Sequence, residues 1–151
     1  MRKLLFITFL ALTASALTWS AARATDGTPL DGIILPGENA DLSEFLWIKR
    51  PVVVFADNAS DPRFVEQMNF LTARLEDLER RDVVVLTDTD PAASSALRRQ
   101  LRPRGFMLVL IGKDGEVELR KPAPWSVREL SRVIDKMPIR QQEIRDRLGE
   151  N

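Results

Sequence analysis

Six consecutive apolar residues, Pro51-Val52-Val53-Val54-Phe55-Ala56, include three β-branched valines and no polar side chain. An uninterrupted run of this kind is typical of a strand buried on both faces, as in the centre of a parallel sheet. The run Val83–Leu86 repeats the pattern. Between the two runs, Asp61 and Pro62 offer a cap and a first-turn proline for an amphipathic helix that ends near Arg80. Its apolar residues recur at steps of four and three: Phe64, Met68, Leu71, Leu75 and Leu78.

The alternation of strands and helices continues after the second strand. Asp90-Pro91 repeats the cap and proline, and residues 92–101 predict a second helix. Residues 106–111 form a third apolar strand, and residues 116–120 alternate as an edge strand does. The turn Lys113-Asp114-Gly115 joins these two strands into an antiparallel hairpin. The preceding β-α-β-α order implies parallel strands joined by right-handed crossovers, so we expect an α/β fold with a central mixed sheet.

Three further helices are predicted around this core. Asp41, with Glu44 in capping-box position, opens a short helix through Ile48. Ser126 and Glu129 form a second capping box, which opens a helix through Met137. Pro138 ends that helix, and an extra C-terminal helix over residues 139–148 follows it.

The N-terminus predicts a signal peptide. Met1-Arg2-Lys3 carries positive charge, residues 4–17 are uncharged and mostly apolar, and Ala22-Arg23-Ala24 has small residues at the two positions that a signal peptidase recognises. A transmembrane helix is the alternative, but Ser and Thr interrupt the apolar run before it reaches about 20 residues. We therefore expect cleavage after Ala24, a periplasmic or secreted protein, and no integral membrane segment after cleavage. Residues 25–40, rich in Gly and Pro, predict an extended arm, and residues 41–151 predict one domain.

The composition excludes several kinds of chemistry. The sequence contains no Cys, no His and no Tyr. Without Cys there is no disulfide, no thiolate nucleophile and no zinc-thiolate site, and without His there is no imidazole base. The predicted signal peptide holds three of the 22 basic residues and none of the 22 acidic ones, so the mature chain would carry a net charge of −3. This balance argues against nucleic acid as a partner, and no cofactor or metal is expected.

The order β-α-β-α-β-β-α resembles a thioredoxin domain. Val83 to Pro91 resembles the second central strand of that family, and Arg104 to Val117 resembles its last hairpin. On this alignment, Ser60-Asp61-Pro62-Arg63 stands where redox thioredoxins have Cys-Gly-Pro-Cys, and Met107 stands where they have a cis-proline. The resemblance therefore implies the fold without the thiol chemistry.

The sequence is more similar to an uncharacterised thioredoxin-like domain of small exported bacterial proteins, which is also found in animal sushi-repeat-containing extracellular matrix proteins. This similarity covers residues 42–147. It is carried by four segments: Val53-Val54-Phe55-Ala56, Asp61-Pro62-Arg63, Leu110-Ile111-Gly112-Lys113-Asp114-Gly115 and Ile134-Asp135-Lys136-Met137-Pro138. The family implies fold and compartment but no established activity.

The loop after the first central strand is the main candidate site, because open α/β sheets bind ligands at the carboxyl ends of their strands. The candidate ligand-binding residues are Asp57, Ser60, Asp61, Arg63, Asp88 and Met107. Arg63 offers a planar set of donors that would suit an anion. Helix capping is the favoured interpretation of this loop, because Ser60 or Asp61 as the cap and Pro62 at the first helical position account for three of its four residues and leave only Arg63.

Two alternatives concern other side chains. Asp57, Asp61, Asp88 and Asp90 follow neighbouring strands and could hold a divalent cation, although capping explains two of them. A carboxylate pair doing acid–base chemistry would need one raised pKa.

Aromatic residues offer a different kind of surface. Trp47, Phe70 and Trp125 could form a protein-binding surface or pack in the core. The arginines of the last helix, Arg140, Arg145 and Arg147, are predicted to form a solvated face.

These observations favour a non-catalytic binding or structural module with an unknown partner. The alternative is a non-redox enzyme or a small-molecule or anion binder that uses the Ser60–Arg63 loop. A third hypothesis is a degenerate redox protein that works through the thiols of a partner. No catalytic residue is predicted.

Overall fold

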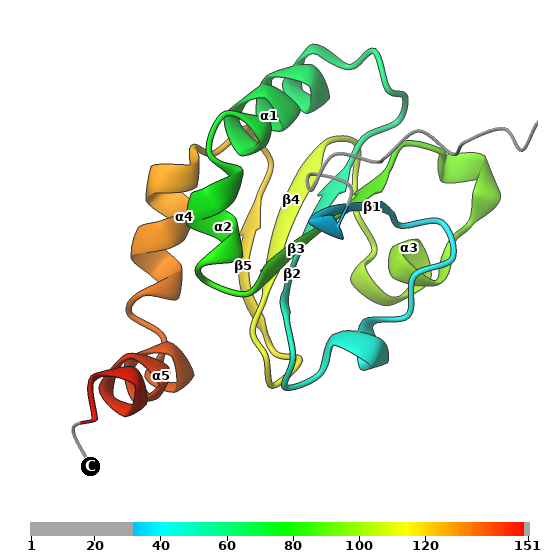
Figure 1. The fold of residues 1–151 in the computed structure, drawn as a ribbon. Coiled ribbons are helices and arrows are strands. Elements are labelled where there is room, and N and C mark those ends of the chain that lie inside the picture. The colour runs from blue at the N-terminus through cyan, green and yellow to red at the C-terminus, as the bar shows by residue number, and fades with distance from the viewer. Residues whose placement is uncertain (1–31, 150–151) are drawn as a thin grey trace, which may run out of the picture.

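A computed structural model describes residues 32–149; the predicted signal peptide lies outside this part of the chain. Its sheet has five strands in the order β1-β3-β2-β4-β5 (Figure 1). The strands are β1 (Ile34–Pro36), β2 (Arg50–Phe55), β3 (Val83–Asp88), β4 (Met107–Ile111) and β5 (Val117–Lys121). β3 runs parallel to both β1 and β2, whereas β2–β4 and β4–β5 are antiparallel. The predicted mixed sheet is confirmed.

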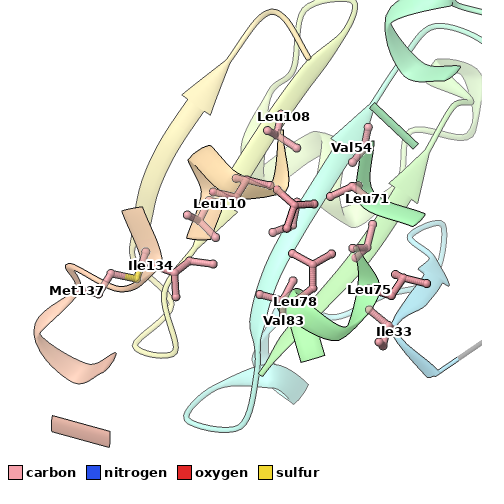
Figure 2. Packing of buried hydrophobic residues seen from close by; sticks show 14 of the residues in the cluster. Ile33, Val54, Leu71, Leu75, Leu78, Val83, Leu108, Leu110, Ile134 and Met137 are labelled. Carbon is pink, nitrogen blue, oxygen red and sulfur yellow. The ribbon is translucent and has the colours of Figure 1, made fainter. Parts of the chain in front are cut away.

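Helices cover both faces of the sheet (Figure 1). They are the 3-10 helices η2 (Leu42–Phe45) and η3 (Pro91–Ala93), and the α-helices α1 (Pro62–Thr72), α2 (Leu75–Glu79), α3 (Ala96–Leu101), α4 (Val127–Ile134) and α5 (Pro138–Leu148). One core cluster packs β-strand residues against α1, α2 and α4, as Figure 2 shows for Leu71, Leu78 and Ile134. The second cluster, on the other face, holds Leu97 and Leu101 of α3, with η2 against it. Among the described residues, no helix is long and apolar enough to cross a membrane.

The sheet has one strand more than the sequence predicted. Within the predicted arm, Ile34–Pro36 forms β1, and Val85 donates its N–H to the carbonyl of Ile33 at 2.6 Å. Ile33 is buried in the core. Gly37 then passes so close to β3 that a Cβ would lie 3.1 Å from the Thr87 carbonyl oxygen. This part of the arm therefore belongs to the domain.

Two predicted helices are each divided in the structure. The helix predicted from Pro62 to Arg80 breaks at Arg74, after which α2 begins. Just before the break, the hydroxyl of Thr72 donates to the Met68 carbonyl, a contact that competes with the helical backbone and favours a bend. The helix predicted over residues 92–101 is also wrong as a single element, because Ser94 is left-handed and Ser95 caps a new helix, α3.

The predictions at the other helix ends are mixed. The capping box that opens α4 is confirmed, since Ser126 and Glu129 bond each other's backbone N–H groups. The helix predicted through Ile48 is a short 3-10 helix instead, and Asp41 caps it by accepting from Ser43 N–H. It ends early because the backbone leaves the helical region at Leu46, with ψ of 128°, and the next residue, Trp47, is left-handed, with φ of +62°. Pro138 both follows α4 and begins α5.

Candidate functional site

The loop after β2 is held by its own side chains. Asn58 accepts the backbone N–H of Ser60 at 2.9 Å, and Asp61 accepts that of Arg63 at 2.9 Å. The cap of α1 is therefore Asp61, and Ser60 lies in the turn before it. The carboxylate of Asp57 lies nearby, 3.8 Å from where a Cβ on Gly105 would stand.

Arg63 is paired with the cap of its own helix. Its guanidinium donates to the two oxygens of Asp61, from Nη2 at 2.8 Å and from Nε at 3.2 Å. These bonds from the Arg63 side chain, and then the one from its backbone, lower the pKa of Asp61 below its ordinary value. The guanidinium also stands 5.6 Å from the ring centroid of Phe106. Asp61 therefore already occupies the Nε and Nη2 donors, two of those that an anionic ligand would use.

Asp88 is buried and fully engaged on a different part of the sheet. It accepts from the Ser95 hydroxyl at 2.5 Å and from Arg98 Nε at 2.8 Å. Arg98 also donates to the carbonyl of Ala56 at 2.7 Å, and its guanidinium lies 5.4 Å from the ring centroid of Phe55. This cluster ties the start of α3 to the ends of β2 and β3.

The structure divides the six candidate residues between the two faces of the sheet. Met107 pairs with Phe55 across β4 and β2 and packs against the core cluster on the α3 side, the side on which Asp88 meets Arg98. Arg63 instead lies against Phe106, which belongs to the cluster on the α1 side. Residues 32–149 contain no group of three acidic side chains that could hold a metal ion.

The opposite end of the sheet carries an exposed apolar surface. Leu46, Trp47 and Ile48, here called the Trp47 patch, are consecutive and have exposed fractions of 39%, 68% and 62%. The turn is fixed by backbone bonds from Trp47 N–H to Lys113 at 2.7 Å and from Lys49 N–H to Phe45 at 2.9 Å. A bulky side chain in the left-handed region costs roughly 1–2 kcal/mol. Trp47 is therefore both exposed and held in an unfavourable backbone conformation.

An open pocket of about 310 Å³ adjoins the Trp47 patch. Leu46 lines it, and the turn between β4 and β5 forms its other side. Its lining residues are Asp41, Leu42, Ser43, Phe45, Leu46, Pro51, Gln100, Ile111, Gly112, Asp114 and Gly115. The sequence alone left open whether Trp47 is exposed or packed in the core, and it did not indicate a pocket beside this residue.

The other aromatic candidates do not form a comparable surface. Trp125 is partly buried against the core, and its ring centroid lies 4.2 Å from Lys121 Nζ. Its backbone N–H and carbonyl both bond the side chain of Gln67, at 2.8 and 2.9 Å. Gln67 itself is completely buried, a polar residue on the apolar stripe of α1.

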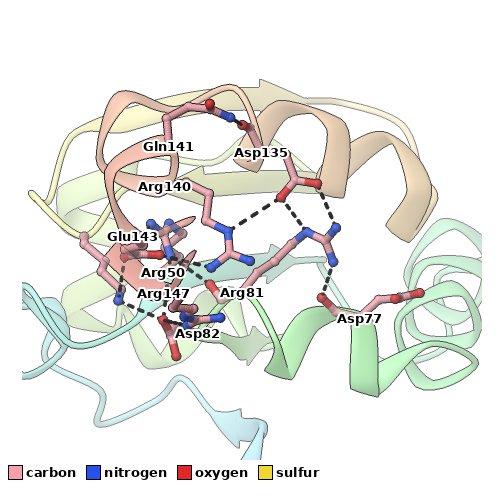
Figure 3. Close-up of polar contacts among 10 residues, drawn as sticks. Arg50, Asp77, Arg81, Asp82, Asp135, Arg140, Gln141, Glu143 and Arg147 are labelled. Carbon is pink, nitrogen blue, oxygen red and sulfur yellow. Dashed lines mark hydrogen bonds and ion pairs between the residues drawn. The ribbon is translucent and has the colours of Figure 1, made fainter. Parts of the chain in front are cut away.

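A buried ion cluster lies between the sheet and α5 (Figure 3). Arg50, which is completely buried, donates to Glu143 at 2.9 Å and to the Arg81 carbonyl at 2.9 Å. Arg140 contacts Glu143 at 3.1 Å, and Lys113 bridges Glu143 and Asp82, each at 2.8 Å. The prediction of a solvated arginine face is therefore wrong for Arg140, which is buried and is paired with Glu143 of its own helix inside this cluster.

The comparisons with known proteins concern both sequence and fold. The family described as "Domain of unknown function (DUF4174)" matches residues 41–143. Coiled-coil domain-containing protein 80 from Danio rerio is 30% identical over 133 residues, in an alignment that covers 68% of this chain and 15% of that protein. This chain thus corresponds to a small part of that relative.

The similar solved structures are thioredoxin-like. The reduced 2-Cys peroxiredoxin of Plasmodium vivax has a TM-score of 0.53 and 16% identity, with 69% of this chain and 85% of that chain covered. Chloroplastic thioredoxin z has a TM-score of 0.52 and 20% identity, with 68% of this chain and 90% of that chain covered. At these identities the likeness concerns the fold alone. The chain, which has no cysteine and a thioredoxin-like fold, belongs to the family described as Domain of unknown function (DUF4174).

Proposed function

We propose that this chain is a non-catalytic binding module, exported to the periplasm or the cell exterior, and that the Trp47 patch is its contact surface. The supporting observation is the exposure of Leu46, Trp47 and Ile48 on a turn whose backbone is strained at Trp47. Exposed Trp side chains are enriched among the residues that dominate binding energy at protein interfaces. Strained backbone persists where the surrounding structure holds it, and such sites are frequently functional.

The chemistry available elsewhere supports a binding role over catalysis. The chain has no Cys or His. The Ser95 hydroxyl donates to the Asp88 carboxylate, which is also paired with Arg98, so neither group is left without a partner. The alternative, a small-molecule or anion site on the Ser60–Arg63 loop, has weaker support. Its main donor, Arg63, is bound to Asp61, although the Arg63 side chain remains half exposed.

Site-specific photo-crosslinking distinguishes these two surfaces. A photoreactive phenylalanine analogue is placed at Ile48, at Arg63, or at Arg128, which is exposed on α4 and belongs to neither surface. In the native compartment, we expect discrete adducts from position 48 and none from position 128. Adding Trp47→Asn should abolish the adducts, because Asn tolerates the left-handed backbone but lacks the indole.

Two results would reject the Trp47 surface. Equal labelling from positions 48 and 128 would show only random collision. Adducts from position 63 alone would show that the binding surface is the loop after β2.

A further inference from the structure

The Trp47 patch adjoins a pocket whose charged lining residues are all acidic. Asp41 and Asp114 are the only charged residues that line the pocket, and both are exposed. Glu44 of η2 is also exposed. None of these three carboxylates forms a salt bridge within residues 32–149. The charges of Asp41, Glu44 and Asp114 are therefore not neutralised by ion pairs within the described part of the chain.

The nearest basic residue of the turn does not neutralise this charge. Lys113 precedes Asp114, but its ammonium group bonds Asp82 and Glu143, both at 2.8 Å, in the buried ion cluster. Its side chain is only 12% exposed. The ammonium group of Lys113 is therefore held by the buried ion cluster, and no Lys or Arg side chain is among the residues that line the pocket.

The size of the pocket restricts what can enter it. Pockets for small molecules have volumes of about 300–1,000 Å³. This pocket, at about 310 Å³, lies at the lower limit. Its lining combines carboxylates with apolar side chains such as Leu42 and Ile111, which suits one long side chain with an apolar stem and a charged end. Lys and Arg have this construction.

The apolar contact and the acidic pocket are immediate neighbours. Leu46 lines the pocket, and the next two residues, Trp47 and Ile48, form the exposed apolar surface. An occupant that uses both must present an apolar side chain close to a basic one. In an extended segment, alternate side chains on one face are about 7 Å apart, which suits two adjacent contacts.

Other classes of occupant fit the charge less well. In a two-fold dimer built on this surface, Asp41 and Asp114 would approach their own copies, and like charges would repel. Nucleic acid and anionic lipid surfaces would be repelled for the same reason.

We infer that the pocket lined by Asp41 and Asp114, together with the Trp47 patch, binds an extended segment of a partner protein that carries Lys or Arg beside a large apolar residue. This inference rests on the proposed function, and it adds the chemistry of the partner. The apolar residue packs on Trp47, and the basic side chain enters the pocket.

The test uses synthetic 12-residue peptides with one Leu or Phe on a Gly/Ser background. A second position, two residues away so that both side chains lie on one face of an extended segment, is Lys, Arg, Gln or Glu. We expect the Lys and Arg peptides to bind the protein at least about threefold more tightly than the Gln peptides at low salt, with the difference shrinking as salt screens the charges. Asp114→Asn should reduce this preference, Trp47→Asn should abolish binding, and Glu66→Gln, on the exposed side of α1, should change neither.

The possible failures are separable. If Gln or Glu peptides bind as tightly as Lys peptides and still require Trp47, the basic partner is refuted while the binding surface stands. If no peptide binds but position 48 still gives adducts, the partner is not such a segment. If neither assay gives a signal, the proposed function fails as well. A dimer in sedimentation equilibrium that Trp47→Asn dissociates would identify a second copy as the occupant and refute the inference.

Discussion

Replacing Glu143 by Gln tests the buried ion cluster that holds α5 to the sheet. Glu143 accepts from three cations: Arg50 at 2.9 Å, Lys113 at 2.8 Å and Arg140 at 3.1 Å. Burial alone would raise the pKa of Glu143. The hydrogen bonds from Lys113, Arg50 and Arg140 together outweigh burial and lower this pKa from its ordinary 4.5 to about 2.

The size of the expected effect follows from this pKa. A carboxyl group with a lower pKa in the folded state stabilises the protein above its unfolded pKa, and this contribution is lost as the pH falls through the folded pKa. The shift from 4.5 to about 2 corresponds to about 3 kcal/mol at neutral pH, since one pKa unit is about 1.4 kcal/mol. Removing one partner of a buried ion pair costs about 3–5 kcal/mol in general, which is consistent with this value.

Urea unfolding followed by Trp fluorescence at pH 7 and pH 2.5 measures the effect. We expect Glu143→Gln to lose about 3 kcal/mol of unfolding free energy at pH 7, and much less at pH 2.5, where the wild type is itself losing the charge. Asp146→Asn, an exposed acid on the same helix that contacts Gln142, is the matched control and should change stability by less than about 0.5 kcal/mol. An equal loss at both pH values, or no loss at pH 7, would refute the role of the Glu143 charge.

Two further substitutions test features on either side of the sheet. Gln67→Leu should destabilise the protein by about 2 kcal/mol in urea unfolding, because the backbone N–H and carbonyl of Trp125 lose their hydrogen bonds to the buried Gln67 amide. The same change at an exposed residue, Gln100→Leu, should show no such loss. Trp47→Asn should keep or raise the melting temperature, since Asn relieves backbone strain worth roughly 1–2 kcal/mol, and a marked drop would mean that the indole supports the fold.

The central strands were predictable because their pattern is local. Val52–Val54 and Val83–Leu86 are uniformly apolar, and burial on both faces of a sheet requires this. The capping box of α4 was equally predictable, since Ser126 and Glu129 satisfy each other within one turn. The helix breaks were not, because the steps of four and three from Met68 to Leu78 continue across the break in α1–α2.

The candidate site was predictable in its sequence position but not in its geometry. The sequence placed Asp88 and Arg63 at the ends of the right elements. It did not show that Asp88 turns to Arg98 on one face while Arg63 lies on Phe106 on the other. The direction of each side chain depends on partners that the local pattern does not contain.

Long-range pairing explains the remaining differences. Arg50 follows the short helix predicted through Ile48, where nothing local indicates burial, yet it is completely buried because its partner, Glu143, lies 93 residues further along the chain. Trp47 presents the opposite problem. Its sequence surroundings resemble those of a core residue, and only the backbone turn fixed through Lys113 leaves the indole in solvent.

The short strand β1 has a consequence for how the domain can be cut from its chain. The family match begins at residue 41, after β1 has already paired with Val85–Thr87 of β3. A chain shortened to that boundary would leave the backbone of β3, whose first four residues are apolar, unpaired at the sheet edge, which is a template for strand-to-strand aggregation. The segment that matches the family is therefore shorter than the segment that is expected to remain in solution. A fragment that resists aggregation needs the residues from Gly32 onward.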